Sequence, residues 1–390
     1  MGAARISATR VETCAAGRTS SRRRSPGSAA VSIAPASRSR ATHAETLLCG
    51  NPVRAAISPT ELPGYARMSL ATISTDRWLV AYAPTPSVGM ATSPIFINVR
   101  PSRNNSIPLT RTPATTAGTL PVPGATLYYE VRGTGPLLLI SQSGEGDADR
   151  STDLVDHLAA DHTVVTYDRR GLSRSTLADP ARPGTLPEHA DDVHRLLAAL
   201  TDQPAHMLGC SLGAVIGLHL AVRHPGQIST LIAHEPVAPW LLPPAERAHH
   251  ERELLNLQQT YRDGGLPAAL PRIAAVLGID PTHQDVEPDL TPQPLTPRRI
   301  ANFDVFIKHD FTAVVRDVLD AGDVAALTGL RIVPATGRTT PRTVFDYRCA
   351  QELAALLSTG LAEFPGGHNG NTTHPGAYAA QLRRVLHNAG

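Results

Sequence analysis

The chain has 390 residues, of which 42% are hydrophobic, and its formal net charge is only +2. This length fits two domains or one large domain with an appendage, and the hydrophobic content is ordinary for a globular protein. The sequence contains no run of 18 apolar residues and no basic segment that leads into an apolar one. These absences exclude a membrane-spanning helix and argue against a secretory signal, so we expect a cytoplasmic protein without a membrane partner.

Residues 1–113 differ from the rest of the chain in charge. They contain 14 Arg, no Lys and four acidic residues, whereas residues 114–390 carry 22 basic and 30 acidic residues. Because the first segment is rich in Ser, Pro and Arg and has few periodic apolar runs, we expect it to be disordered. We favour sequence upstream of a misplaced start, with Met68 or Met90 as the later start, over an organelle transit peptide. No aromatic interleaving supports nucleic-acid binding.

The cysteines give no sign of a metal or disulfide site. Cys14, Cys49, Cys210 and Cys349 are far apart in the sequence and follow no ligand spacing. The chain also lacks a phosphate-cradling loop and a His/Cys/Asp/Glu motif with metal-ligand spacing. We therefore expect no metal and no cofactor.

From about Gly118 onward, short apolar strands alternate with helices. This alternation predicts an α/β fold with a mostly parallel sheet and helices on both of its faces. Eight strands are expected, and they span residues 120–122, 125–131, 137–140, 163–167, 205–208, 229–233, 330–334 and 361–364. The first two flank Pro123-Gly124 and should form a hairpin. Residues 114–390 thus form one domain.

Residues 237–325 interrupt this alternation after the sixth strand. Pro-rich segments there alternate with helical ones, such as residues 245–262 and 297–319. We interpret this insertion as a helical cap over the sheet. Its aromatic residues Trp240, Phe303 and Phe306 form either an apolar pocket for an acyl group or a packing layer between the cap and the core.

A serine lies at the turn between the fifth strand and the next helix. Gly209, Ser211 and Gly213 match the pattern G-x-S-x-G, in which small residues flank a serine on a sharp strand-to-helix turn. The apolar helix expected over residues 212–223 fits this context. The pattern is typical of a nucleophile elbow, which exposes the serine hydroxyl.

Several separate features occur in an order that resembles the α/β-hydrolase superfamily. They are the opening hairpin, the turn Asp168-Arg-Arg-Gly171, the elbow, the helical insertion and the loop Gly366-Gly-His368 before the last helix. The resemblance covers residues 118–390. Within the superfamily, the chain looks most like bacterial serine-type hydrolases of unassigned substrate, which carry the sequence His-Glu-Pro, here residues 234–236, at the strand before the cap. It implies an eight-stranded α/β-hydrolase sheet and a cofactor-free hydrolase that cleaves an ester, thioester or lactone.

The resemblance also implies the catalytic residues. Ser211 would be the nucleophile, and His368 would be the general base that takes its proton, with His374 as the fallback. Many members of the superfamily carry the acid just after the strand that here spans residues 330–334, but residues 335–340 contain no carboxylate. Glu235 is therefore the expected acid, and Asp346 is the alternative.

Two backbone N–H groups should form the oxyanion hole. Leu212 follows the nucleophile and supplies the first, and Ser143 is the choice for the second, with Gly144 nearly as well placed. The acids Glu145 and Asp147 of the same loop either line the mouth of the site or face solvent. Asp168-Arg-Arg-Gly171 is interpreted as a structural turn that ties loops together and not as part of the site.

Other functions use the same residues. Carbon–carbon bond hydrolysis and perhydrolase activity need the same triad, and a receptor or sensor that binds a small molecule with little turnover can retain it. A serine at the elbow argues against epoxide hydrolases and haloalkane dehalogenases, because their chemistry needs a carboxylate nucleophile. In each remaining case, the expected partner is a small molecule and not a nucleic acid.

Overall fold

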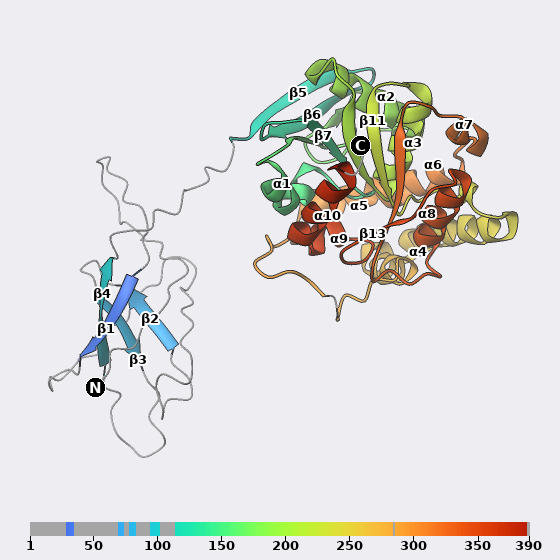
Figure 1. The fold of residues 1–390 in the computed structure, drawn as a ribbon. Helices are drawn as coiled ribbons and strands as arrows, with labels where there is room; N and C mark the ends of the chain where they lie inside the picture. The colour runs from blue at the N-terminus through green and yellow to red at the C-terminus, as the bar shows by residue number, and fades with distance from the viewer. Residues whose placement is uncertain are drawn as a thin grey trace. The chain divides into compact units, whose positions relative to one another are not determined.

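The computed structural model describes residues 114–283 and 285–387 and four strands that precede them. Those strands are β1 (Ala29–Ala34), β2 (Ser69–Ile73), β3 (Trp78–Tyr82) and β4 (Pro94–Pro101). They pair antiparallel in the order β1-β4-β3-β2 and belong to one unit, Met1–Arg111. The rest of residues 1–113, for which the sequence predicts disorder, lies outside the described residues. The second unit is Thr112–Gly390 (Figure 1).

One mixed sheet of nine strands forms the centre of the second unit. The strands are β5 (Thr116–Val122), β6 (Ala125–Arg132), β7 (Leu137–Ser141), β8 (Thr163–Tyr167), β9 (Thr176–Leu177), β10 (Ala205–Cys210), β11 (Ile228–His234), β12 (Arg331–Gly337) and β13 (Ala362–Phe364). Their order is β13-β12-β11-β10-β7-β8-β6-β5, and β9 pairs with β6. From β13 to β8 the strands are parallel, whereas β6 is antiparallel to β8.

The eight strands predicted from the sequence correspond to the eight along this path. The sheet differs from the prediction in having a ninth strand, β9, which is only two residues long and therefore leaves no alternating pattern in the sequence. The opening hairpin is present, with Val122 opposite Ala125. Its turn relies on Gly124, whose φ of 76° lies in the left-handed region that glycine adopts without strain.

Helices cover both faces of the sheet because its central strands are apolar on both sides. Leu138 and Ile140 of β7 pack with α1 (Thr152–Leu158) and α10 (Pro375–His387), whereas Leu139 packs with α2 (Leu186–Leu200) and α3 (Leu212–Arg223) (Figure 1). Three further short or peripheral helices are η1 (Ala148–Ser151), α8 (Phe345–Leu356) and α9 (Gly370–Thr373). The helices on the two faces fix the positions of the ends of the central strands.

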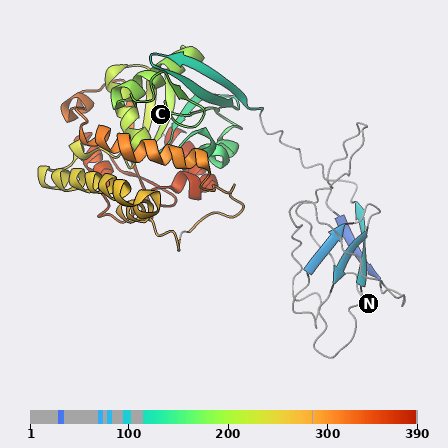
Figure 2. The ribbon, with the colours of Figure 1, turned by 180° about the vertical axis from the view of Figure 1, so that it is seen from behind.

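A helical insertion separates β11 from β12. It comprises η2 (Pro239–Leu241), α4 (Pro244–Val276), α5 (Pro297–Val305), the π-helical turn η3 (Phe306–Asp310), α6 (Phe311–Val315) and α7 (Ala321–Ala325). Figure 2 shows the run from α5 to α6 (orange) beside α4 (yellow), in agreement with their contacts. The helix expected over residues 245–262 corresponds to the first arm of α4. At Gly265, with a φ of 65°, the helix breaks, and a second arm continues to Val276.

In the part of the chain that the structure describes, no helix combines the length and the apolar character needed to cross a membrane.

Candidate active site

Ser211 lies on the turn between β10 and α3 in a backbone conformation that side chains rarely adopt. Its φ is 54° and its ψ is −114°, which is strained for a residue with a Cβ. The backbone around it holds this conformation, because the Ser211 N–H donates to the carbonyl of His234, 2.9 Å away. Strain of this kind clusters at functional sites, where the surrounding structure imposes it.

The two flanking glycines are required by close backbone contacts. A Cβ on Gly209 would lie 2.5 Å from the carbonyl oxygen of Gly213, and a Cβ on Gly213 would lie 2.1 Å from that of Ser141. Since Ser141 ends β7, the second contact shows that the loop after β7 packs directly against the start of α3. The structure therefore brings together the two segments that contain Leu212 and Ser143.

His368 lies in the loop between β13 and α9 and pairs with a carboxylate. Its Nδ1 is 2.7 Å from Oε2 of Glu235, and both side chains are buried. The other Glu235 oxygen, Oε1, accepts the N–H of Gly337 at 2.8 Å. Glu235 follows β11 with a φ of 45° and is the second strained residue of this region.

The electrostatics of this pair favour the charged forms of both groups. Burial alone would raise the pKa of Glu235, but the hydrogen bond from His368 and the nearby imidazoles outweigh it and lower that pKa. Burial likewise opposes charge on His368, but the bond to Glu235 and the neighbouring carboxyl groups outweigh it and raise the pKa of the imidazole. An imidazole held in this way can accept a proton from a hydroxyl group and return it to a leaving group.

Asp346 lies at the same imidazole. It was expected only as the alternative acid. It lies in the first turn of α8, and its Oδ2 is 3.4 Å from Nδ1 of His368. Because α8 begins at Phe345, its first turn brings this carboxyl group to the histidine loop. His374, the fallback base, instead contacts Thr373 and Asp285.

The loop after β7 is fixed by side chains from the helical insertion. Both nitrogens Nε and Nη2 of Arg299 donate to the carboxylate of Glu145, at 3.1 and 2.8 Å. Asp147 accepts the hydroxyl of Ser173, which also bonds Asn302. Glu145 and Asp147 are buried and therefore do not face solvent. These contacts hold the backbone of Ser143 and Gly144 near the elbow.

Phe306 covers this loop. A Cβ on Gly144 would lie 1.9 Å from Cε2 of the Phe306 ring, so the ring rests on the backbone at Gly144. Phe306 also meets Phe311 edge to face, with ring centroids 4.7 Å apart. Phe303 is buried in the core of the insertion. Of these aromatic residues, Phe306 has the closest contact with the candidate site.

Known proteins resemble this chain over the second unit. The alpha/beta hydrolase fold family matches residues 136–319. A hydrolase of Bacillus subtilis (strain 168), YraK, is 38% identical over 272 residues, which are 69% of this chain and 95% of the relative. The chain belongs to the α/β-hydrolase superfamily.

Solved structures agree with this membership. A hydrolase from Pseudomonas aeruginosa PA01 has a TM-score of 0.51 at 25% identity, and the match covers 69% of this chain and 98% of the hydrolase. The enol-lactonase from Burkholderia xenovorans LB400 has the same TM-score at 20% identity and is matched over its whole length, against 69% of this chain. At 20% identity, the similarity to the enol-lactonase shows a shared fold and nothing further. The comparisons support hydrolase activity for this α/β-hydrolase.

The Asp168-Arg-Arg-Gly171 turn of this α/β-hydrolase ties its loops together, as its interpretation as a structural turn predicts. Asp168 accepts the N–H of Ala148 at 2.9 Å. Nη2 of Arg169 donates to the carbonyl of Gly144 and to Oδ2 of Asp310, which is 2.7 Å away in η3. Sequence reasoning missed Asp310 and Arg299, because only the fold brings them to the loop.

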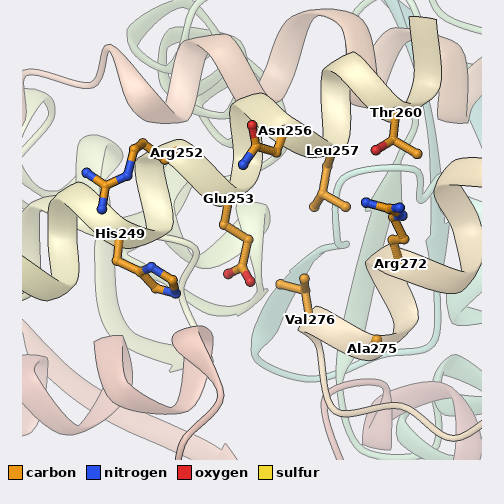
Figure 3. Close-up of a pocket in the computed structure, with 9 residues that line it drawn as sticks. All are labelled: His249, Arg252, Glu253, Asn256, Leu257, Thr260, Arg272, Ala275 and Val276. Atoms are coloured by element: carbon orange, nitrogen blue, oxygen red, sulfur yellow. The ribbon is translucent and has the colours of Figure 1, made fainter. Parts of the chain in front are cut away.

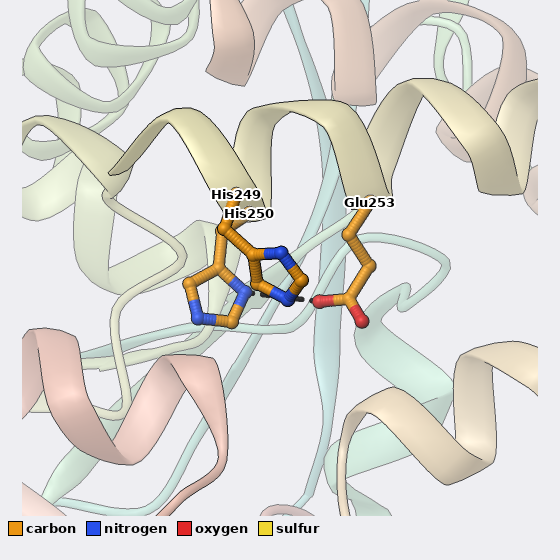
Figure 4. Close-up of side chains that lie close together, drawn as sticks. All are labelled: His249, His250 and Glu253. Carbon is orange, nitrogen blue, oxygen red and sulfur yellow. Dashed lines mark hydrogen bonds and ion pairs between the residues drawn. The ribbon is translucent and has the colours of Figure 1, made fainter. Parts of the chain in front are cut away.

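Two features of the α/β-hydrolase lie on α4, outside the set of predicted site residues. A pocket of about 410 Å³ opens between the two arms of α4, with Glu253 and Leu257 facing Val276 across it (Figure 3). Beside it, His249, His250 and Glu253 place one donor atom each within 4.8 Å of the others (Figure 4). Two imidazoles and a carboxylate are donors that suit Zn²⁺.

Sequence reasoning also missed this group, although His249 and Glu253 stand four residues apart, which is the spacing of one helix face. His250 stacks on the ring of Phe345, with centroids 4.2 Å apart, and its Nδ1 lies 2.9 Å from Oε2 of Glu253. None of the residues around Ser211 belongs to the group.

Proposed function

We propose that this α/β-hydrolase is a serine hydrolase that cleaves a small ester, thioester or lactone through an acyl-enzyme on Ser211. The observation that carries the proposal is the buried pair of His368 and Glu235, 2.7 Å apart, in a fold that presents Ser211 on a strained turn. A neutral serine is a weak nucleophile, and a base of this kind is what it needs in order to attack a carbonyl carbon. The reaction requires no cofactor.

In the proposed reaction, His368 takes the proton of the Ser211 hydroxyl while the oxygen attacks the carbonyl carbon. Glu235 holds the proton on Nδ1, so that Nε2 is the nitrogen that receives the serine proton, and it stabilises the resulting imidazolium. The imidazolium then protonates the leaving group as the tetrahedral intermediate collapses. Water, deprotonated by His368, releases the acyl group and restores Ser211.

The oxyanion of the intermediate would be bound by two backbone N–H groups. Leu212 begins α3, and the first N–H groups of a helix have no partner within it. The N–H of Ser143 is the second donor, supported by the contact between its loop and Gly213. Preorganised donors of this kind each lower the barrier by roughly 3–4 kcal/mol.

The helical insertion would act as a cap that shapes the acyl pocket. We call residues 142–147, the loop after β7, the oxyanion loop. Phe306 rests on this loop at Gly144, so an acyl chain bound above Ser211 would meet its ring. We therefore expect apolar acyl groups to be preferred, and Phe306→Ala to raise the rate ratio of longer to shorter p-nitrophenyl esters.

The test is covalent labelling of the full chain with a fluorophosphonate probe, together with hydrolysis of short p-nitrophenyl esters. We expect Ser211→Ala to abolish labelling and to lower kcat by about 10⁴-fold or more, because nucleophile and base act as a unit. Ser229→Ala is the matched control, since its hydroxyl bonds the Ala205 carbonyl at the opposite end of β11. A folded wild type with neither labelling nor turnover would overturn the proposal and favour a small-molecule sensor.

A further inference from the structure

Two carboxyl groups face one nitrogen of His368. Oε2 of Glu235 is 2.7 Å from Nδ1, and Oδ2 of Asp346 is 3.4 Å from the same atom. The two come from different elements, the end of β11 and the first turn of α8. A single Nδ1–H can make only one good hydrogen bond, and the shorter distance assigns that bond to Glu235.

Asp346 is buried without a hydrogen bond of its own. It is 1% exposed, and neither of its oxygens has a hydrogen-bond partner among the described residues. Glu235, in contrast, has both the imidazole and the N–H of Gly337. An unpartnered buried carboxyl group costs stability, so its position beside the imidazole points to a role.

The surroundings of Asp346 keep it close to the point of ionisation. Its pKa is raised to about 7: burial is the main cause, His368 lowers the pKa, and the charges on Glu235 and Glu253 raise it. Its place in the first turn of α8 favours the charged form, because the N-terminus of a helix attracts negative charge. Burial and the charge of Glu235 thus both favour the neutral form of Asp346, since two carboxylates at one site rarely ionise together.

We propose that Asp346 is a reserve acid for His368: a positioning residue that stays protonated while Glu235 is charged and becomes the imidazole's carboxylate partner when that charge is lost. The inference rests on the proposed function, because it assigns His368 the role of base. Loss of the Glu235 charge removes the largest repulsion between carboxylates at the site. Asp346 then releases its proton to solvent and accepts the Nδ1–H after a shift of less than an ångström.

The experiment compares four forms of the full chain: wild type, Glu235→Gln, Asp346→Asn and the double variant. We expect kcat to fall by about 10- to 100-fold in Glu235→Gln and by less than about threefold in Asp346→Asn at pH 7. In the double variant we expect a loss on the order of 10⁴-fold, the loss that follows when a catalytic imidazole has no carboxylate partner. The second substitution would thus matter far more in the absence of Glu235 than in its presence.

A pH profile separates this role from a structural one. In Glu235→Gln, the rise of kcat with pH should include the ionisation of Asp346 as well as that of His368, so it should be steeper than in the double variant, where His368 alone titrates. Glu352→Gln is the control for loss of a carboxylate from the same helix as Asp346 and should leave kcat within about twofold, since Glu352 pairs with Arg348. Urea unfolding of each variant checks that it is folded.

Two results would overturn the inference. One is a double variant that is no less active than Glu235→Gln; the other is an Asp346→Asn variant whose kcat at pH 7 falls as far as that of Glu235→Gln. Either result can occur in an enzyme whose wild type is labelled at Ser211, so failure of this inference is distinct from failure of the proposed function. Absence of labelling in the wild type would instead reject the function itself.

Discussion

The elbow and the oxyanion loop, which meet at Gly213, are held in place by different forces. The elbow depends on backbone contacts within the sheet, such as the bond from the Ser211 N–H to the His234 carbonyl. The oxyanion loop depends on charged side chains of the insertion, chiefly Arg299 on Glu145 and the link from Arg169 to Asp310. The position of the proposed nucleophile therefore depends on the sheet, whereas the position of the proposed second oxyanion donor depends on the insertion.

This difference predicts which substitutions affect which part of the reaction. Changes in the insertion should lower transition-state stabilisation and leave the serine reactive toward a small probe. Changes at the elbow should remove both. Four predictions test the contrast, from the largest expected effect to the smallest.

The largest effect is expected from Gly213→Val. Its Cβ would lie 2.1 Å from the Ser141 carbonyl oxygen, and backbone on both sides cannot move far. We expect loss of fluorophosphonate labelling and a fall in kcat of at least about 10³-fold, with destabilisation of several kcal/mol. Gly360→Val is the contrast for glycine replacement at an open position, because a Cβ there meets nothing within 4 Å. Normal labelling of Gly213→Val would refute the close packing.

Asp310→Ala should have the next largest effect. It leaves Arg169 buried without its carboxylate, which typically costs about 3–5 kcal/mol. Because Arg169 also holds the carbonyl of Gly144, kcat should fall by about 30-fold while labelling persists. Urea unfolding and ester hydrolysis measure the two effects. A stability loss with unchanged kcat would separate the buried ion pair from the oxyanion loop.

Arg299→Gln should affect kcat more than stability. Its ion pair with Glu145 is partly exposed, so we expect a loss of at most about 1 kcal/mol. Glu145 would retain the weaker contact with Arg150 at 3.4 Å, and kcat should fall by about tenfold with little change in KM. Arg338→Gln breaks an exposed pair with Glu363 and serves as the control. Equal kcat in the two variants would argue against the loop contact.

The smallest effect is a displacement of the pH profile. Only neutral His368 can accept a proton, and its raised pKa means that activity is lost as pH falls through a value above 6.5. The acid limb of kcat/KM should therefore lie above pH 6.5. His374→Asn should leave that limb in place, because His374 contacts Asp285 and not Glu235. A limb that moves with His374 would transfer the base to that residue.

Much of the fold is readable from local patterns in the sequence. The central strands are short apolar runs and the helices are periodic, so the α/β-hydrolase membership was predicted correctly. The same patterns failed for features that are too short or too local to leave a period in the sequence. Strand β9 has only two residues, and the break of α4 at Gly265 depends on one positive φ. The helix expected over residues 297–319 ends at Val315 after a π-helical turn.

The candidate site was readable where chain order restricts it. The serine motif and the glycine-flanked histidine identify Ser211 and His368, and the contact of His368 with Glu235 matches the expected pairing. Their catalytic roles stay predictions. The order of the motifs does not indicate that Asp346 reaches the imidazole, because this contact depends on where the first turn of α8 lies in the fold.

The π-helical turn Phe306–Asp310 offers a route to altered substrate range. A π turn contains one residue more than an α turn, so the deletion of a single residue there would restore an ordinary helix. Each residue of an α-helix advances the chain by about 100° around the axis. Such a deletion would rotate one flank of the turn against the other and separate the position of Phe306 from that of Asp310. Single-residue indels at this turn would therefore let related enzymes diversify the ring above the acyl group without a change in the sheet.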